Sequence, residues 1–104
     1  MKSLFVVLAI AAFLFGLNAC GTQPAACFKV TTPADSIRVG KAVQFDGSCS
    51  NSAKVYKWDF GNGEISNEGR PETVYDSAGN YDVLLLVLNG GKSSNVTQTI
   101  VVKP

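Results

Sequence analysis

The sequence predicts an all-β domain in which about seven short strands pack as a two-layered sandwich. Three observations lead to this prediction. After residue 20 no stretch of ten residues has helical periodicity, turn residues recur at short intervals, and the runs between them are rich in β-branched and aromatic residues. With 104 residues the chain has room for one domain of this kind.

A strand around the chain's only tryptophan organises the predicted core. Tyr56, Trp58 and Phe60 share one parity, so their side chains point to one face of an extended strand. Lys57 and Asp59 take the opposite face, which we expect to be in water. Because three aromatic rings on one face need apolar neighbours on several sides, Trp58 predicts a second layer opposite this strand.

The turn after this strand is Gly61-Asn62-Gly63. Asparagine tolerates a left-handed backbone better than most residues, and glycine has no Cβ to oppose one. We therefore expect Asn62 to suit a left-handed position here. Asp59 is expected to accept hydrogen bonds from backbone N–H groups of the turn, a structural role rather than a catalytic or metal-binding one.

Proline and glycine divide the rest of the chain into further strands. Pro33, Gly40 and Gly79 are the expected breaks, and Asn89-Gly90-Gly91-Lys92 is a strong hairpin signal between two β-rich runs. The predicted strands cover residues 27–31, 36–39, 41–46, 53–60, 64–66, 72–76, 81–88 and 94–102.

The first residues are typical of a secretory signal rather than of the folded domain. Met1-Lys2-Ser3 carries one positive side chain, residues 4–17 are almost entirely apolar, and a break in composition follows. The apolar run is shorter than the stretch of about 20 residues that spans a bilayer, which makes an uncleaved anchor the weaker interpretation. We assign residues 1–19 to a helical signal peptide.

The segment Leu17-Asn18-Ala19-Cys20 resembles the lipobox of bacterial lipoproteins, in which an aliphatic residue and two small residues precede a cysteine. The resemblance implies that Cys20 is acylated when the signal is removed, although Asn18 departs from the usual small residue. Lipidation of Cys20 leaves an even number of cysteines; the alternative is an ordinary secretory signal with Cys20 free or paired. We expect an exported protein that is lipid-anchored to the bacterial cell envelope, with the choice of membrane and leaflet open. Residues 20–26 are then a short tether and residues 27–104 the folded domain.

The charge of the mature chain is balanced. Nine Lys and Arg residues less Lys2 leave eight basic residues against eight acidic ones. A basic surface for nucleic acid is therefore absent, and no polybasic patch adds to membrane binding.

With these residues placed, the chain resembles a polycystic-kidney-disease (PKD) domain over roughly three quarters of its length. That family's pattern is Tyr-x-Trp-Asp-Phe-Gly-Asp-Gly, then a Ser and a Pro, then Tyr-x-x-x-Gly-x-Tyr-x-Val-x-Leu-x-Val. Asn62 replaces the family's Asp, which argues against a cation at this position if that Asp serves one elsewhere in the family. The matching residues are Tyr56, Trp58, Asp59, Phe60, Gly61, Asn62, Gly63, Ser66, Pro71, Tyr75, Gly79, Tyr81, Val83, Leu85 and Val87.

The resemblance implies an immunoglobulin-like sandwich without the disulfide that joins the two sheets of antibody domains. Phe45 and Val83 take the positions of that bridge and flank Trp58, so apolar packing replaces the bond. Tyr81, two residues before Val83, matches the position of a tyrosine corner, whose hydroxyl bonds back to the chain.

A different disulfide is predicted between Cys27 and Cys49. They lie at the start of the first predicted strand and just past the end of the strand at 41–46, so antiparallel pairing of these strands makes them neighbours. Export permits oxidation, and closing this loop contributes roughly 3 kcal/mol in the chain-entropy model. The alternative is two free buried thiols.

Residues for catalysis or metal binding are scarce. The chain has no His, and its acidic residues are scattered without the spacing of an acid–base pair or a calcium loop. The glycine-rich turn lacks the Lys and the following helix of a phosphate loop. We predict no enzyme activity, no cofactor and no metal site.

The longest predicted strand breaks the alternation of apolar and polar residues. Because its odd-numbered residues face the core, Leu84, Leu86 and Leu88 must point outward, and Val55 and Val101 are expected on the same face. Scattered apolar residues are normal on a surface, whereas a contiguous patch favours a contact surface. The sequence therefore predicts that this face binds a protein partner or a second copy of the chain.

Two other functions stay open as alternatives. One is a carbohydrate-binding accessory protein of a glycan-uptake or cell-wall system, because the PKD family often accompanies glycan-degrading enzymes. The other is a purely structural surface protein. Glycan sites usually need exposed aromatic rings, and nearly all aromatic residues of the mature chain take core positions of the family. These residues are Phe28, Phe45, Tyr56, Trp58, Phe60, Tyr75 and Tyr81.

Overall fold

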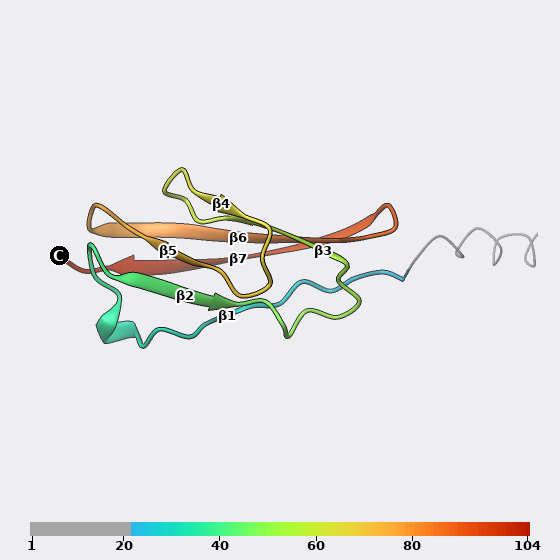
Figure 1. The fold of residues 1–104 in the computed structure, drawn as a ribbon, viewed down its shortest axis with the longest axis horizontal. Helices are drawn as coiled ribbons and strands as arrows, with labels where there is room; N and C mark the ends of the chain where they lie inside the picture. Colours follow the sequence, from blue (N-terminus) through green and yellow to red (C-terminus); the bar gives the residue numbers. More distant parts are fainter. Residues whose placement is uncertain (1–21) are drawn as a thin grey trace, which may run out of the picture.

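The computed structural model describes residues 22–104, which form two antiparallel β-sheets packed face to face (Figure 1). The predicted all-β sandwich is confirmed. Its elements are β1 (Lys29–Val30), η2 (Ala34–Ser36, a 3-10 helix), β2 (Ala42–Asp46), β3 (Val55–Asp59), β4 (Ile65–Ser66), β5 (Glu72–Val74), β6 (Gly79–Asn89) and β7 (Lys92–Val102).

The smaller sheet has the strand order β1-β2-β5 and the larger one the order β4-β3-β6-β7. The long hairpin β6–β7 forms half of the larger sheet, and Asn89 pairs with Lys92 across its turn. Gly90 and Gly91 both have positive φ, 54° and 84°, as a two-residue hairpin of type I′ requires. Gly79 begins β6, so it is not the break that the sequence predicts. The hairpin turn lies at the end of the domain where the described chain begins, and the C-terminus lies at the opposite end (Figure 1).

The smaller sheet is less regular than the sequence predicts. The strand expected at 27–31 is reduced to Lys29–Val30, and the one expected at 36–39 is replaced by η2 and an isolated bridge. Pro33 precedes η2, and proline has no N–H to donate to a sheet ladder. The chain therefore leaves the sheet at this point and curls before β2.

The core between the sheets is centred on Trp58, which is 2% exposed. Its ring centroid lies 5.1 Å from that of Phe28, 5.7 Å from that of Phe45 and 5.9 Å from that of Phe60. Its indole N–H donates to the Glu68 carbonyl at 2.6 Å, so the polar atom of this buried ring is satisfied. The rest of the buried apolar core is Ile37, Val43, Tyr75, Val83, Leu85, Val87, Ile100 and Val102.

Two tyrosines of the expected core lie at its margin. Tyr56 and Tyr81 are both half-buried and pack against the core cluster. The Tyr81 hydroxyl donates to the Ser77 carbonyl at 2.7 Å, which is the backward hydrogen bond of a tyrosine corner.

The predicted disulfide is present between Cys27 and Cys49, whose Cα atoms are 5.3 Å apart. Antiparallel pairing of β1 with β2 brings the two segments together. Ser50 adds to this junction, because its hydroxyl donates to the Cys27 carbonyl at 2.8 Å and accepts from the Cys27 N–H at 2.9 Å. The smaller, irregular sheet is thus the one that carries a covalent brace.

The signal peptide and the lipidation site at Cys20 lie outside the described residues. Residues 23–26, which the sequence analysis assigns to the tether, lie against the domain. Ala25 forms a bridge with Asn51, and the Gln23 side chain donates to the Ser93 carbonyl at 2.9 Å. Within residues 22–104 no helix is long and apolar enough to cross a membrane.

Candidate interaction surfaces

The outer face of the larger sheet carries a row of leucines. Along β6 the odd residues from 83 to 87 are fully buried, whereas Leu84, Leu86 and Leu88 lie on the opposite face and are half-buried. Their exposure is partial because a side chain of β3 and one of β7 flank each leucine. The flanking pairs are Asp59 and Thr97 for Leu84, Lys57 and Asn95 for Leu86, and Val55 and Ser93 for Leu88.

Val101 does not join this row, which corrects the prediction of one continuous patch. It is 57% exposed and lies opposite Asn80. Between Val101 and Leu84 lies the pair of Asp82 and Thr99, in which the threonine hydroxyl donates to the carboxylate at 2.6 Å. Parity gives the face of a residue but not its neighbours along the ladder, so the sequence did not reveal this polar separation.

Ile65 is exposed at the other edge of the same sheet face, where Asp59 of β3 separates it from Leu84. It lies opposite Asp59 in the short strand β4 and is 78% exposed. A shallow hollow of about 500 Å³ beside it is lined by Lys57, Trp58, Ser66 and Asn67. The sequence analysis missed Ile65, although it was the one large apolar residue in a segment already expected to be a strand. We call the surface of Val55, Ile65, Leu84, Leu86 and Leu88 the leucine face.

The turn between β3 and β4 is fixed by side-chain hydrogen bonds. The Asp59 carboxylate accepts from the Gly61 N–H at 3.0 Å, in the structural role expected for it. Asn62 does not adopt a left-handed backbone; Gly61 and Gly63 do, with φ of 80° and 90°. The Asn62 amide instead donates to the Val74 carbonyl of β5 at 3.0 Å, which ties the turn to the other sheet. An Asp could not donate this bond.

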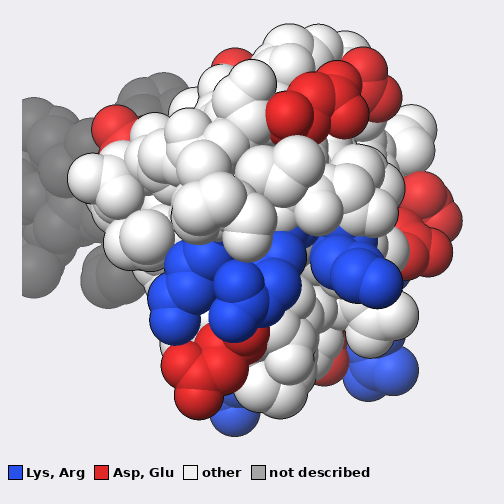
Figure 2. All heavy atoms as spheres, turned by 90° about the vertical axis from the view of Figure 1, so that its left-hand side faces the viewer, with Lys and Arg blue, Asp and Glu red and all other residues white. Residues whose placement is uncertain are grey.

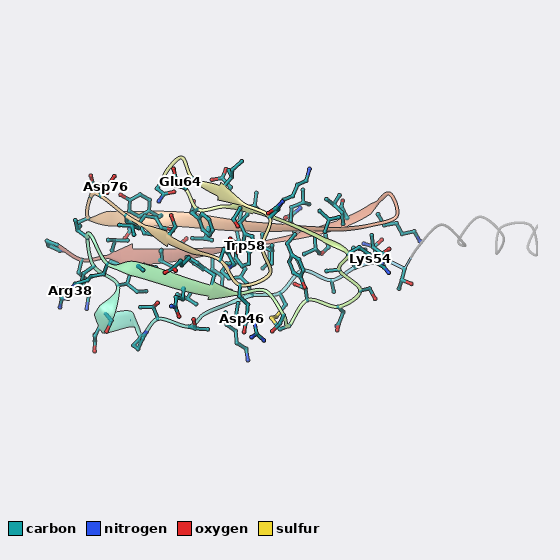
Figure 3. All side chains as sticks on the ribbon, in the orientation of Figure 1. Arg38, Asp46, Lys54, Trp58, Glu64 and Asp76 are labelled. Carbon is teal, nitrogen blue, oxygen red and sulfur yellow. A yellow bond between two sulfur atoms is a disulfide. The ribbon has the colours of Figure 1, made fainter. Side chains whose placement is uncertain are left out.

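A polar pocket of about 770 Å³ lies next to this turn. Its lining includes the carboxylates of Glu64, Glu72 and Asp76 and the side chain of Tyr81, and Figure 3 labels Glu64 and Asp76 on this side of the domain. Within residues 22–104 no three Asp, Glu, Cys or His side chains are arranged to hold a metal ion. The pocket therefore offers hydrogen-bond acceptors and one ring edge, but no preformed metal centre.

Tyr81, which lines this pocket, packs against a buried tyrosine. Tyr75 is fully buried, its ring centroid lies 4.4 Å from that of Tyr81, and its hydroxyl donates to the Phe60 carbonyl at 2.8 Å. Burial raises the pKa of Tyr75 far above its ordinary value, and the nearby Tyr81 and Asp59 add to the rise. This phenol is a structural donor rather than a proton-transfer group.

The end of the domain that carries the C-terminus has a divided charge. Figure 2 shows basic side chains gathered across the middle of this end and acidic ones towards its margins. Arg38 lies at this end (Figure 3).

At the end of β2, the Asp46 carboxylate is held by neighbouring groups. Hydrogen bonds from the Ser48 hydroxyl and N–H lower the pKa of Asp46, and Arg70, 3.4 Å away, adds to the effect. These groups brace exposed loops and do not converge on a reaction site.

A sequence model of the PKD domain matches residues 23–104. Among curated proteins, collagenase ColQ1 of Bacillus cereus (strain Q1) is 36% identical over an alignment of 88 positions that covers 80% of this chain and 9% of the collagenase. The chain thus spans less than a tenth of the length of that relative.

Two solved structures resemble the fold. One, of carbohydrate-binding modules from the β-sandwich superfamily with promiscuous specificity, superposes with a TM-score of 0.72 and 29% identity over 80% of this chain and 35% of that one. The other is the PKD1 domain of the metalloprotease PrtV from Vibrio cholerae, with a TM-score of 0.64 and 33% identity over 80% of this chain and 100% of that one.

Proposed function

Because this chain belongs to the PKD domain family, we propose that it is an exported, non-enzymatic binding module that is lipid-anchored at Cys20 and engages a protein partner or a second copy through the leucine face. The PKD domain is a non-catalytic module, and the similarity to collagenases is confined to that module. The disulfide between Cys27 and Cys49 supports export, since such bonds persist in oxidising compartments.

The leucine face is the observation that carries this proposal. A half-solvated antiparallel sheet normally alternates apolar and polar residues, and its outer face is polar. Here β6 places three leucines there, the exposed Val55 lies beside Leu88, and the exposed Ile65 lies beyond Asp59 on β4. An apolar surface of this kind loses its contact with water when a partner covers it, which favours binding.

The way the chain enters the domain supports a close attachment to the membrane. Gln23 and Ala25 are held against the domain near the hairpin turn, so a leash from a lipid on Cys20 could include only the residues before Gln23. At about 3.3–3.6 Å per residue such a leash reaches roughly 10 Å. The end with Lys54 then faces the bilayer, and the opposite end with Arg38 and Asp76 faces away from it (Figure 3).

The test is a crosslinking pull-down from native membranes with the full chain and two variants. The double substitution Leu84→Thr and Leu86→Thr is expected to abolish capture and to leave the melting temperature within a few degrees. Val101→Thr is the matched control, because it makes the same kind of change on the same face but outside the leucine row. Partners and oligomer mass that are unchanged in the double variant would overturn the proposal.

Carbohydrate binding is the second candidate, and the similarity to carbohydrate-binding modules favours it. The polar pocket with Tyr81 and Asp76 would be its site. Against it stands the burial of the aromatic residues, because among residues 22–104 no aromatic side chain is fully exposed and only Tyr56 and Tyr81 are half-buried. A glycan array probed with residues 21–104 separates the two candidates, since binding that Leu84→Thr and Leu86→Thr do not alter would favour the carbohydrate.

A further inference from the structure

The long strand β7 forms one edge of the larger sheet, and the middle of that edge is open. Successive residues of a strand direct their backbone N–H and C=O groups to opposite sides. In β7 the even-numbered residues bond to β6, because Asn89 and Lys92 form the hydrogen-bonded pair that closes the two-residue turn. The odd-numbered residues therefore present their backbone groups to the outside of the sheet.

Both ends of this edge are already occupied by other parts of the chain. At one end the Gln23 side chain donates to the Ser93 carbonyl at 2.9 Å. At the other end the Lys103 N–H donates to the Ile37 carbonyl at 3.0 Å, and its carbonyl accepts from the Val39 N–H at 2.9 Å. These contacts support the conclusion that the odd-numbered residues direct their backbone groups outward, because each contact uses Ser93 or Lys103.

Between these two ends, the outward backbone groups of Asn95, Thr97, Thr99 and Val101 bond to no other group within residues 22–104. All four residues are exposed. Natural proteins protect such edges with charges, proline or bulges, whereas residues 93–102 contain no charged residue, no proline and no glycine and pair with β6 without a bulge. The open stretch therefore has the hydrogen-bonding groups and the shape to accept one more antiparallel strand.

We propose that the occupant of this edge is β7 of a second copy of the chain. Antiparallel pairing of two identical strands has twofold symmetry, the commonest symmetry of protein dimers. One register uses every open residue and no occupied one: Thr97 lies opposite Thr99 of the partner subunit, and Asn95 lies opposite Val101 of the partner subunit. A shift by one pair in either direction would require Ser93, whose carbonyl is already bonded, or Lys103, whose N–H and carbonyl both are.

The chemistry of the strand suits its own copy. No like charges meet in this register, because the flanking Lys92 and Lys103 fall beside uncharged positions of the other strand. Threonine pairs across strands are favourable. The dimer joins two four-stranded sheets into one continuous sheet, and the twofold axis perpendicular to it places both leucine faces on the same side. The edge is separate from the leucine face, so this inference does not depend on the proposed function.

Residues 22–104 hold both sheets and the whole core, so this fragment serves for the test. Sedimentation equilibrium is expected to give a monomer–dimer mass that rises with concentration. Amide hydrogen exchange of Asn95, Thr97, Thr99 and Val101 is expected to slow as the dimer forms, whereas their even-numbered neighbours are protected throughout. A monomer up to about 1 mM with these four amides in fast exchange would overturn the proposal.

Charge variants identify the surface that associates. Thr97→Lys with Thr99→Lys places like charges opposite each other and is expected to weaken the dimer at least about tenfold. Mixing this chain with a Thr97→Glu, Thr99→Glu chain is expected to restore association. Ala42→Lys with Gln44→Lys, two exposed positions of β2 on the outer face of the smaller sheet, is the control with equal added charge. A dimer that the lysine pair leaves unchanged, or that only Leu84→Thr with Leu86→Thr dissociates, would contradict edge pairing.

Discussion

Neighbouring leucines of β6 show how differently the two faces of one strand are used. Leu85 points between the sheets and is fully buried, whereas Leu84 and Leu86, one residue away on either side, lie on the outer face and are half-buried. All three residues are leucines and have the same strand propensity. Whether the position is odd or even along the strand therefore decides whether the side chain stabilises the fold or is available to a partner. The two faces therefore respond differently to the same substitution.

The largest expected effect is on the inner face, at its central ring. Trp58→Ala removes a buried indole and is expected to lower the free energy of unfolding by about 3–5 kcal/mol. A domain of this size has little stability beyond that, so the variant is expected to be unfolded at room temperature. Circular dichroism and thermal melting measure this.

Ile65→Ala is the comparison on the outer face. Because Ile65 is 78% exposed, its truncation is expected to change stability by less than about 0.5 kcal/mol. A Trp58→Ala chain that melts within a few degrees of the wild type would refute the assignment of the core.

The second prediction compares two adjacent leucines directly. Leu85→Ala is expected to cost about 2–5 kcal/mol, because it leaves a cavity among packed side chains. Leu86→Ala removes the same atoms from a half-buried position and is expected to cost about 1 kcal/mol or less. Urea denaturation of the two variants gives both values, and equal losses would show that the outer face is as tightly packed as the inner one.

The third prediction tests whether the inner face has any free space. A Cβ on Gly47 would lie 3.0 Å from the Trp58 ring and 3.2 Å from the Tyr56 ring. Gly47→Ala is therefore expected to overpack the core and to cost about 1–3 kcal/mol. Gly69→Ala is the matched control, because its nearest neighbour would be the Tyr56 ring at 3.9 Å, an ordinary contact. If the two variants were equally stable, the packing around Trp58 would be looser than these distances imply.

The division between the faces could be predicted from the sequence because it depends on local parity. The alternation of Tyr56, Trp58 and Phe60 gave the inner face, and Asn89-Gly90-Gly91-Lys92 gave the hairpin. The family resemblance gave the sandwich, and the cysteine placement gave the disulfide.

What parity could not give is the alignment of one strand with the next. The inclusion of Ile65 and the separation of Val101 from the leucines both depend on the register across turns, which tertiary packing sets. The role of Asn62 was misjudged for a related reason. Its amide bonds to β5, which is distant in sequence, and no local pattern indicates such a partner. The open edge of β7 also required knowledge of the strand order.

The last and smallest of the inner-face effects distinguishes a hydroxyl of the core from one at its margin. Tyr75→Phe removes the hydrogen bond to the Phe60 carbonyl and is expected to cost about 1 kcal/mol at neutral pH. The raised pKa of Tyr75 adds a pH dependence. In the unfolded chain this phenol ionises near pH 10, whereas in the folded domain it stays neutral. The contribution of Tyr75 is therefore complete below about pH 10 and is lost as the pH rises above that value, because ionisation then favours the unfolded chain.

Urea midpoints measured from neutral pH to above pH 10 test this sign. The wild type is expected to lose stability above about pH 10 more steeply than Tyr75→Phe, so the two curves converge as the pH rises. Tyr81→Phe is the control, because it removes the neighbouring hydroxyl, which bonds to Ser77, and leaves Tyr75 in place. Its alkaline loss is expected to remain steeper than that of Tyr75→Phe, because burial, the largest cause of the raised pKa of Tyr75, is unchanged. Parallel curves for the wild type and Tyr75→Phe would mean that this phenol reaches water in the folded domain, and the inner face would then be open beside Tyr81.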